Sequence, residues 1–289
     1  MPQTATTGNL ESAQKIIIAS SRYTEEHNAP ALALIESFSL PKGAKQVTVP
    51  KVGQMSMSDL TDGQDIIDEE DIGMTTVDLT ASEVGAKIIL TDKLIRQSAE
   101  NVMSIVGRQL GDGMARKKDN DVTALYSGFS TDLGSAGYTM KLSNLSAAVA
   151  YAHGKNFGSQ VYINHHPFTV WDVANTAVTA SSTYPVPKGW SEDLLGNFFS
   201  GLRPINGVAI FEDGNISIDG STDDAIGVIA DKSALAVLKS VETRTERQRD
   251  ASLRATELVM TSDYGVFELD DSKGAAMTLD ASTPGFTSG

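Results

Sequence analysis

The chain has 289 residues, 40% of them hydrophobic and 21% charged, which is ordinary for a globular protein and leaves room for one large domain or two modest ones. It contains no cysteine, so disulfide bonds and thiolate metal sites are excluded, and the composition fits a reducing compartment. The net charge of -14 argues against tight binding to DNA, which requires a basic surface.

Residues 1–28 predict a polar N-terminal arm, with only a short helical pattern between Leu10 and Ile17. They lack the basic start and the apolar run of a signal peptide. No stretch of the chain approaches the roughly 18 apolar residues that a membrane span needs. Residues 29–43 then predict a short apolar helix or strand that ends at Pro41.

Residues 44–91 are predicted to form a long hairpin, because apolar and polar residues alternate from Val47 to Val52 and again from Val77 to Leu90. The segment between these strands carries acidic charges and no basic ones, so it resists burial and is expected to be an exposed tip. A calcium site is disfavoured because the DxDxDG spacing and the closing glutamate are missing. The acidic residues of the tip are Asp59, Asp62, Asp65, Asp68, Glu69, Glu70 and Asp71.

One long helix is predicted over residues 92–126, with a cap at Asp92 or the residue before it and a stop at Gly128. At about 1.5 Å per residue it would be roughly 50 Å long and would act as a strut. Gly107 and Gly111 either let another backbone approach closely or are merely tolerated. Its apolar stripe, at helical spacing, consists of Ile95, Ala99, Val102, Val106, Leu110, Met114, Val122 and Leu125.

After a connector rich in glycine and serine, helical and strand patterns alternate, which predicts a compact α/β domain. Helices are expected at residues 142–154, 166–178, 191–201 and 231–240, and strands at 160–164, 207–213 and 225–231.

Strand patterns return after Val241, at residues 253–260 and 265–269, followed by a short apolar piece. These late strands need an apolar partner, and the long helix offers its stripe. We therefore expect them to pack on that helix, although the two segments are far apart in the chain. The overall fold class is predicted to be α+β.

No catalytic, cofactor or metal site is predicted. The motifs GxxxxGK[ST], GxSxG and HExxH are all absent from the sequence. His165 and His166 are adjacent, so they cannot both face one metal ion from a regular element, and Asp172 stands at no recognised ligand spacing. We expect the histidines to have a structural hydrogen-bonding role and the protein not to be an enzyme.

Three segments carry a resemblance to a known family: VDLTASEVGAK at 77–87, LTDKL at 90–94 and GDGMARKKD at 111–119. They look like the return strand of an extended loop that runs into a spine helix, as in the major capsid proteins of tailed bacteriophages with the Hong Kong 97-like fold. YGV at 264–266 resembles the turn into that family's late strands. The resemblance covers nearly the whole chain in order, through loose patterns rather than invariant chemistry.

The resemblance implies a division of the chain into four parts. These are an N-terminal arm (1–28), an extended loop (44–91), an axial α/β domain (141–240), and a peripheral domain made from 29–43, the spine-helix region 92–140, and the return strands and tail 241–289.

The resemblance also implies a function. Copies of the chain would form the pentamers and hexamers of an icosahedral phage head that encloses double-stranded DNA, assembled in the host cytoplasm and retained in the virion. Expected partners are a separate scaffolding protein or none, a portal protein and a decoration protein, with no cofactor and no membrane. An acidic wall suits a container, because it does not hold DNA tightly.

Two other functions are compatible with the sequence. An encapsulin-like nanocompartment has a related fold but holds protein cargo, and electron microscopy with a nucleic-acid test would distinguish it. An unrecognised α/β enzyme would instead be a small oligomer with a substrate pocket, which mass photometry would reveal.

One contact between subunits is predicted from charge. The acidic tip lacks positive charge, and the densest arginine group of the chain lies near residue 250, so the two are expected to meet between neighbouring copies. The alternative is that both segments are solvated and never meet. The residues concerned are Asp65, Asp68, Glu69, Glu70 and Asp71 on one side and Arg244, Arg247, Arg249 and Arg254 on the other.

Overall fold

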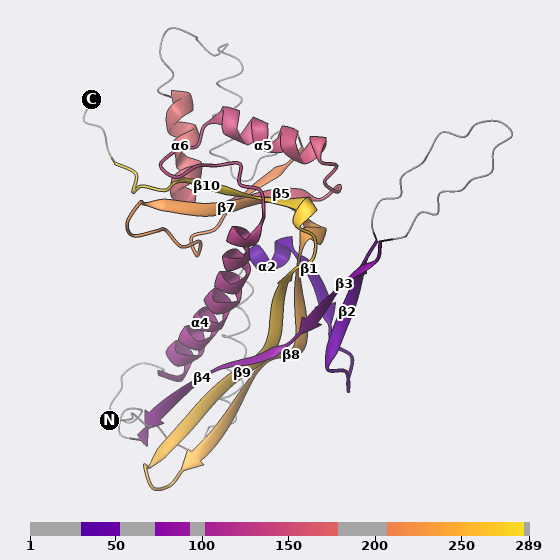
Figure 1. The fold of residues 1–289 in the computed structure, drawn as a ribbon. Helices are drawn as coiled ribbons and strands as arrows, with labels where there is room; N and C mark the ends of the chain where they lie inside the picture. The colour runs from indigo at the N-terminus through magenta and orange to yellow at the C-terminus, as the bar shows by residue number, and fades with distance from the viewer. Residues whose placement is uncertain (1–29, 53–72, 93–101, 179–206, 286–289) are drawn as a thin grey trace, which may run out of the picture.

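The computed structural model describes residues 30–52, 73–92, 102–178 and 207–285. Two four-stranded sheets and one two-stranded ribbon are joined by a long helix that runs from the second sheet along the first (Figure 1). The predicted α+β class is confirmed. Among the described helices, none has the length and apolar character to cross a membrane.

The first sheet has the strand order β1-β8-β9-β4. β8 and β9 form a long antiparallel pair from Leu235 opposite Glu268 to Asp250 opposite Ala255, and β4 adds to the outer side of β9. β1 is parallel to β8 and pairs only with the start of that strand. The strands are β1 (Glu36–Ser39), β4 (Ser82–Thr91), β8 (Leu235–Asp250) and β9 (Ala255–Glu268).

The long helix is present as α4 (Val102–Ala124), followed by the 3₁₀ turn η1 (Leu125–Gly128). Its predicted stop at Gly128 is confirmed. At its predicted start, Thr91 is the last residue of β4 and Asp92 follows it, whereas residues 93–101 lie outside the described residues. On α4 the apolar stripe is buried, and it packs against β9 and β4, as predicted for the late strands. This cluster consists of Leu90, Val106, Leu110, Met114, Leu258 and Met260.

The hairpin is present but shorter than predicted. β2 (Gln46–Lys51) pairs with β3 (Thr75–Thr80) in antiparallel register, while the acidic tip lies outside the described residues. The return strand divides at Ala81, and its second part becomes β4 of the first sheet. The division has a physical cause, because β4 buries Leu90 in the cluster beneath α4.

The second sheet has the order β10-β7-β5-β6, with β5 and β6 parallel. The predicted helices α5 (Leu142–Gly154) and α6 (Pro167–Val178) are confirmed, and α5 packs on β7. β10 follows β9 but leaves the first sheet and pairs with β7. The strands are β5 (Val161–His165), β6 (Ala209–Glu212), β7 (Asp224–Asp231) and β10 (Gly274–Asp280).

Two predictions were wrong. Residues 231–240 are not a helix but the 3₁₀ turn η2 (Lys232–Ala234) and the start of β8. Its apolar residues from Leu235 to Leu238 are buried between two neighbouring strands, which favours a strand over a one-sided helix. The two late strands are one continuous strand, β9, and the helix expected at residues 191–201 lies outside the described residues.

Another apolar cluster joins the first sheet to the second. The short helix α2 (Pro30–Leu34) contributes Ala31, and the end of α4 and η1 contribute Val122 and Tyr126. These pack with Val228 of the second sheet and Leu235 of the first. The end of α4 is therefore fixed to both sheets.

Candidate functional site

The two adjacent histidines are both held by hydrogen bonds within the chain. His165 is fully buried on β5, where Nε2 lies 3.0 Å from the carbonyl oxygen of Met277 and Nδ1 accepts the backbone N–H of His166 at 2.8 Å. This arrangement requires a neutral ring with its proton on Nε2. Burial lowers the pKa of His165 to about 4, although the bond to Met277 acts in the opposite direction.

No group of three metal-ligating side chains occurs in the part of the chain that the structure describes. Asp172 has a raised pKa of about 6, first because it is partly buried and second because Asp280 is near. That pair has no third ligand among the described residues. The features of the described residues that bear on function are exposed surfaces and the polar junctions between elements.

The predicted arginine group lies on the outer half of β8 and in the turn after it. All four arginines are exposed. Arg249 also pairs within the chain, with Nη1 3.4 Å from Oδ1 of Asp92, and Arg244 lies 3.4 Å from Glu246. Arg254 adopts a left-handed backbone with φ of 48° and its carbonyl oxygen accepts the N–H of Asp92.

The acidic partners proposed for these arginines, Asp65, Asp68, Glu69, Glu70 and Asp71, lie outside the described residues. The contact between the two groups therefore stays a prediction. What the structure adds is that Arg249 and Arg244 already have acidic neighbours, so they present less unbalanced positive charge than the sequence indicates.

The other basic run of the sequence, residues 116–118, is also divided by the fold. Arg116 is exposed, Lys117 pairs with Asp121 at 2.5 Å, and Lys118 is buried. Nζ of Lys118 donates to Thr243 at 3.0 Å and lies 5.5 Å from the centre of the Tyr264 ring. Lys118 thus helps to fix α4 to the first sheet and is not available to bind nucleic acid.

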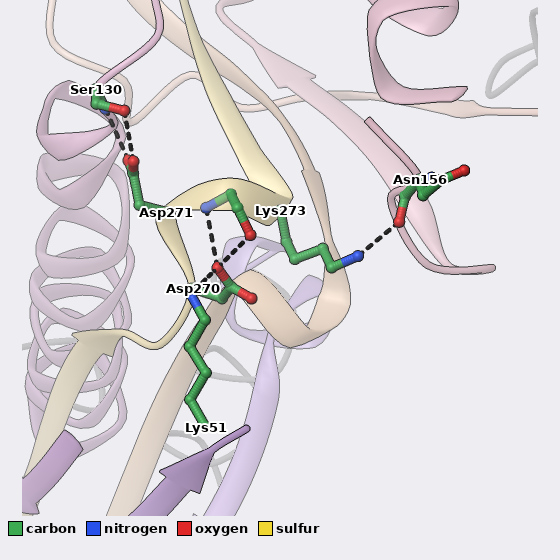
Figure 2. A network of polar contacts seen from close by, with 7 residues as sticks. Lys51, Ser130, Asn156, Asp270, Asp271 and Lys273 are labelled. Carbon is green, nitrogen blue, oxygen red and sulfur yellow. Dashed lines mark hydrogen bonds and ion pairs between the residues drawn. The ribbon is translucent and has the colours of Figure 1, made fainter. Parts of the chain in front are cut away.

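A polar junction lies at the turn η3 (Asp271–Lys273) between β9 and β10, and no motif in the sequence indicates it. Figure 2 shows side chains of this turn reaching three separate segments. Nζ of Lys51, at the outer end of β2, is 2.5 Å from Oδ1 of Asp270. Asp271 accepts the backbone N–H of Ser130 at 2.8 Å, and Lys273 donates to the carbonyl oxygen of Asn156 at 2.5 Å.

The electrostatics of this junction favour a charged Asp270. Burial acts to raise its pKa, but hydrogen bonds from Lys51 and Ser272 outweigh burial and lower the pKa below its ordinary value. The junction therefore holds the hairpin, the connector after α4 and the end of α5 to a single turn. It fixes the direction in which the hairpin projects.

A second junction is a buried polar group between α4 and the second sheet, which the sequence analysis did not predict. Asp119, Asn164 and Asp213 are each at most 1% exposed, and Asn164 donates to the hydroxyl of Tyr126 at 2.8 Å. One signal could have revealed it: Asp119 lies four residues after Ala115 and three before Val122, which places it on the buried face of α4.

Exposed apolar side chains occur at the ends of the projecting elements. Val52 and Met74, which flank the hairpin tip, are 57% and 61% exposed, and Leu253 in the β8–β9 turn is 45% exposed. In the second half of the molecule, Tyr138 and Trp171 are also exposed. Single exposed apolar residues are common on protein surfaces. The ones described here, however, lie at the ends of projecting elements.

No family model and no curated protein matches the sequence. The fold, however, matches solved structures of phage capsids over most of its length. The capsid of Ralstonia phage GP4 matches with a TM-score of 0.65 and 12% identity, covering 88% of this chain and 89% of that one. The capsid of a native GTA particle matches with a TM-score of 0.65 and 10% identity, covering 88% and 91%.

The capsid of Cyanophage P-SCSP1u is similar to the same degree, with a TM-score of 0.63 and 14% identity over 86% of this chain and 87% of that one. At identities this low, the matches show a shared fold and nothing more. The matches extend over most of both chains, so they concern the fold as a whole rather than one common motif.

Proposed function

We propose that this chain is the major capsid protein of a tailed bacteriophage and assembles into an icosahedral head around double-stranded DNA. The observation that carries the proposal is the fold shared with phage capsid structures over 86–88% of the chain in the three comparisons above.

The elements correspond to a Hong Kong 97-like arrangement. In this proposal α4 is the spine helix, β2 and β3 are the inner part of the extended loop, and residues 1–28 are the N-terminal arm. The first sheet and α4 belong to the peripheral domain, and residues 141–240 form the axial domain. Two strands depart from a simple division. β8 begins at Leu235, within 141–240, but belongs to the first sheet, and β10 follows the late strands in sequence but pairs with β7.

A shell subunit must contact several neighbours while keeping its own shape. The buried stripe of α4 and the η3 junction provide rigidity, and the hairpin and the β8–β9 turn provide projecting surfaces. The exposed side chains of Val52, Met74 and Leu253 are available to contact a neighbouring copy. The acidic charge of the chain keeps the shell wall from adhering to DNA.

The contact between subunits is proposed to include charges. The acidic tip of one copy meets Arg244, Arg247, Arg249 and Arg254 of its neighbour. The support is the exposure of all four arginines on one projecting strand pair. A single exposed pair contributes only about 0.2–1 kcal/mol, but the contact is repeated throughout a closed shell.

Assembly is proposed to take place in the host cytoplasm, with a portal protein, a decoration protein and either a separate scaffolding protein or none. Negative-stain electron microscopy of the purified full chain tests the proposal directly. Icosahedral particles are expected, with DNA inside those recovered from virions. Particles that hold protein cargo and no DNA would favour an encapsulin-like compartment, and a small soluble oligomer would contradict both.

A further inference from the structure

Two buried carboxyl groups meet where α4 reaches the second sheet. Asp119 of α4 is 0% exposed, and Asp213, which follows β6, is 1% exposed. Asn215 links the two, because its backbone N–H donates to Oδ1 of Asp213 and its side-chain amide donates to Oδ2 of Asp119, and Asp213 is near enough to raise the pKa of Asp119. The contact joins two segments that are distant in the chain, so it helps to set how α4 lies against the second sheet.

The hydrogen bonds around this pair leave one oxygen without a donor. Asp119 accepts the backbone N–H of Ala31 at Oδ1 (3.0 Å) and the amide of Asn215 at Oδ2 (2.8 Å). Oδ1 of Asp213 accepts the backbone N–H of Asn215 at 2.9 Å. No donor among the described residues reaches Oδ2 of Asp213, a buried atom that faces a like charge if both groups are ionised.

No cationic side chain of the described residues compensates the pair. Lys118, next to Asp119, is directed to Thr243. From β5 and the start of α6, His165 is neutral, and burial lowers the pKa of His166 although Asp213 acts to raise it. From η1, Tyr126 is neutral because burial raises its pKa, and Tyr162 of β5 acts in the same direction on that pKa. Burial also keeps Tyr162 neutral by raising its own pKa. The residues of α2 contribute a backbone N–H and no titratable group.

We propose that Asp119 and Asp213 hold one proton between them, and that this proton makes the junction of α4 with the second sheet a pH-dependent latch. The proton supplies the missing donor: one carboxyl donates its O–H to the other. With the proton in place, the pair holds α4, the loop after β6 and, through Ala31, the start of α2 together. When the proton leaves, two negative charges face each other away from water and the latch weakens.

The direction of the pH dependence follows from burial. Burial raises the pKa of Asp119 to about 7, and Asp213 acts in the same direction, while the bonds from Asn215 and Ala31 oppose them. The unfolded chain releases this proton near the ordinary pKa of 3.8. The latch is therefore fully closed below about pH 4 and is lost as the pH rises through about 7. Within that window each pH unit increases the unfolding equilibrium constant about tenfold for one proton.

Two isosteric substitutions in the same pair distinguish a shared proton from ordinary packing. In Asp213→Asn, the new amide donates permanently to the Asp119 carboxylate, and its oxygen still accepts the N–H of Asn215. In Asp119→Asn, one accepting oxygen becomes a donor that faces Ala31 N–H or the Asn215 amide, so two donors oppose each other. We expect Asp213→Asn to be tolerated and Asp119→Asn to be destabilised at every pH.

The measurement is urea unfolding of the full-length protein, in the same assembly state, from about pH 5 to about pH 8. The ratio of the unfolding constants of Asp213→Asn and wild type should fall as the pH rises to about 7 and then level off. His165 contributes equally to both proteins and cancels in this ratio, and a His166→Gln background in both removes the histidine whose pKa Asp213 acts to raise. Asp219→Asn is the matched control, because this exposed aspartate has a pKa lowered mainly by its hydrogen bond from Ser221 and does not titrate in this range.

Equal pH profiles for wild type and Asp213→Asn would overturn the proposal, as would equal tolerance of the two substitutions. Infrared spectroscopy at about pH 6 provides an independent measurement that needs no refolding. We expect more absorption from protonated buried carboxyl groups in the wild type than in Asp213→Asn, while Asp172 contributes equally to both. Equal absorption in the two proteins would also overturn the latch.

Discussion

Lys51 and Asp270 join the outer end of β2 to the turn between β9 and β10, with Nζ 2.5 Å from Oδ1. The two residues come from opposite ends of the chain, and their side chains are 42% and 19% exposed. A partly exposed pair adds only about 0.2–1 kcal/mol to stability. Its importance is geometric, because it restrains the projecting hairpin against the body of the molecule.

Lys51→Met removes this pair while leaving the Ser272 bonds to Asp270 in place. We expect the free energy of unfolding to fall by no more than about 1 kcal/mol, because the lost pair is partly solvated. Particle yield, read by sedimentation, should fall more clearly, because the hairpin gains freedom that assembly must then restrict. Lys45→Met, an exposed lysine just before β2, is the control; equal yields for the two variants would contradict the anchoring role.

Val106→Asp tests the packing of α4 on the first sheet. Val106 is 6% exposed and lies in the cluster with Leu258 and Met260, so the new carboxylate would be buried without a partner. We expect a loss of about 3–5 kcal/mol, measured by denaturant unfolding. Ile105→Asp is the matched control, because Ile105 is the preceding residue of the same helix and is 43% exposed; an equal loss in both would show that burial is not the cause.

Gly227→Ala tests the tight contact between β7 and His165. A Cβ at Gly227 would lie 2.1 Å from Cδ2 of His165 and 2.7 Å from the carbonyl oxygen of Asn164. The imidazole is held on both nitrogens, so it cannot easily move, and we expect a loss of at least about 1–3 kcal/mol. Gly113→Ala on the exposed side of α4 meets nothing within 4 Å and should instead stabilise the protein, by up to about 1 kcal/mol. Calorimetric melting temperatures should shift in opposite directions.

Some of these elements could be predicted from the sequence and others could not. The stripe of α4 was predictable because Val106, Leu110 and Met114 follow the helical period, and one buried face is enough to produce that pattern. The helices α5 and α6 were predictable for the same reason. The segment from Leu235 to Leu238 was not, because a short apolar run has no period that separates a buried strand from a helix.

The polar junctions could not be predicted because they depend on contacts between distant segments. Lys51 and Asp270 are unremarkable alone, and their pairing exists only once β2 lies beside the η3 turn. Asp119 stands in a run of charged residues that suggests a solvated face, whereas the fold buries it against Asp213. The sequence identifies the arginines near residue 250 as a dense group, but the intrachain pair of Arg249 with Asp92 depends on the fold.

His165→Gln tests the buried neutral imidazole. The folded-state pKa of about 4 is below the ordinary value of 6.5, so the stabilising contribution is fully present above about pH 6.5 and is lost as the pH falls toward 4. This loss amounts to roughly 3 kcal/mol for the wild type. Glutamine offers one acceptor and one donor but no titration, so the variant should lack this part of the acid sensitivity.

The experiment is urea unfolding at several pH values below neutrality, with His165→Gln compared with wild type at each pH. The comparison is necessary because the Asp119–Asp213 pair changes stability in the opposite direction over the same range. An acid sensitivity of His165→Gln equal to that of the wild type would mean that His165 is protonated in the folded protein or titrates normally. Neither is compatible with its two hydrogen bonds as described.

The charged contact between subunits is tested by charge reversal. Arg247→Glu together with Arg249→Glu places negative charge where the acidic tip of a neighbour is proposed to lie, so the subunit should fold but assemble poorly. Because Arg249 also pairs with Asp92, Arg249→Gln is the control for loss of that intrachain pair alone, and it should assemble nearly as well as the wild type.

Changing Asp68 and Glu69 to Lys in the charge-reversed chain should partly restore assembly, because each contact then regains opposite charges with their signs exchanged. Particle yield would be read by sedimentation across a salt series, and the difference between the variants should shrink as salt screens the contact, since the Debye length falls to about 3 Å at 1 M. Rescue is the decisive part, because general damage to the strand pair would lower the yield but could not be repaired by lysines at residues 68 and 69, which are not part of that pair. Normal assembly of the arginine variant, or a failure of the lysines to rescue it, would mean that the acidic tip has another partner or none.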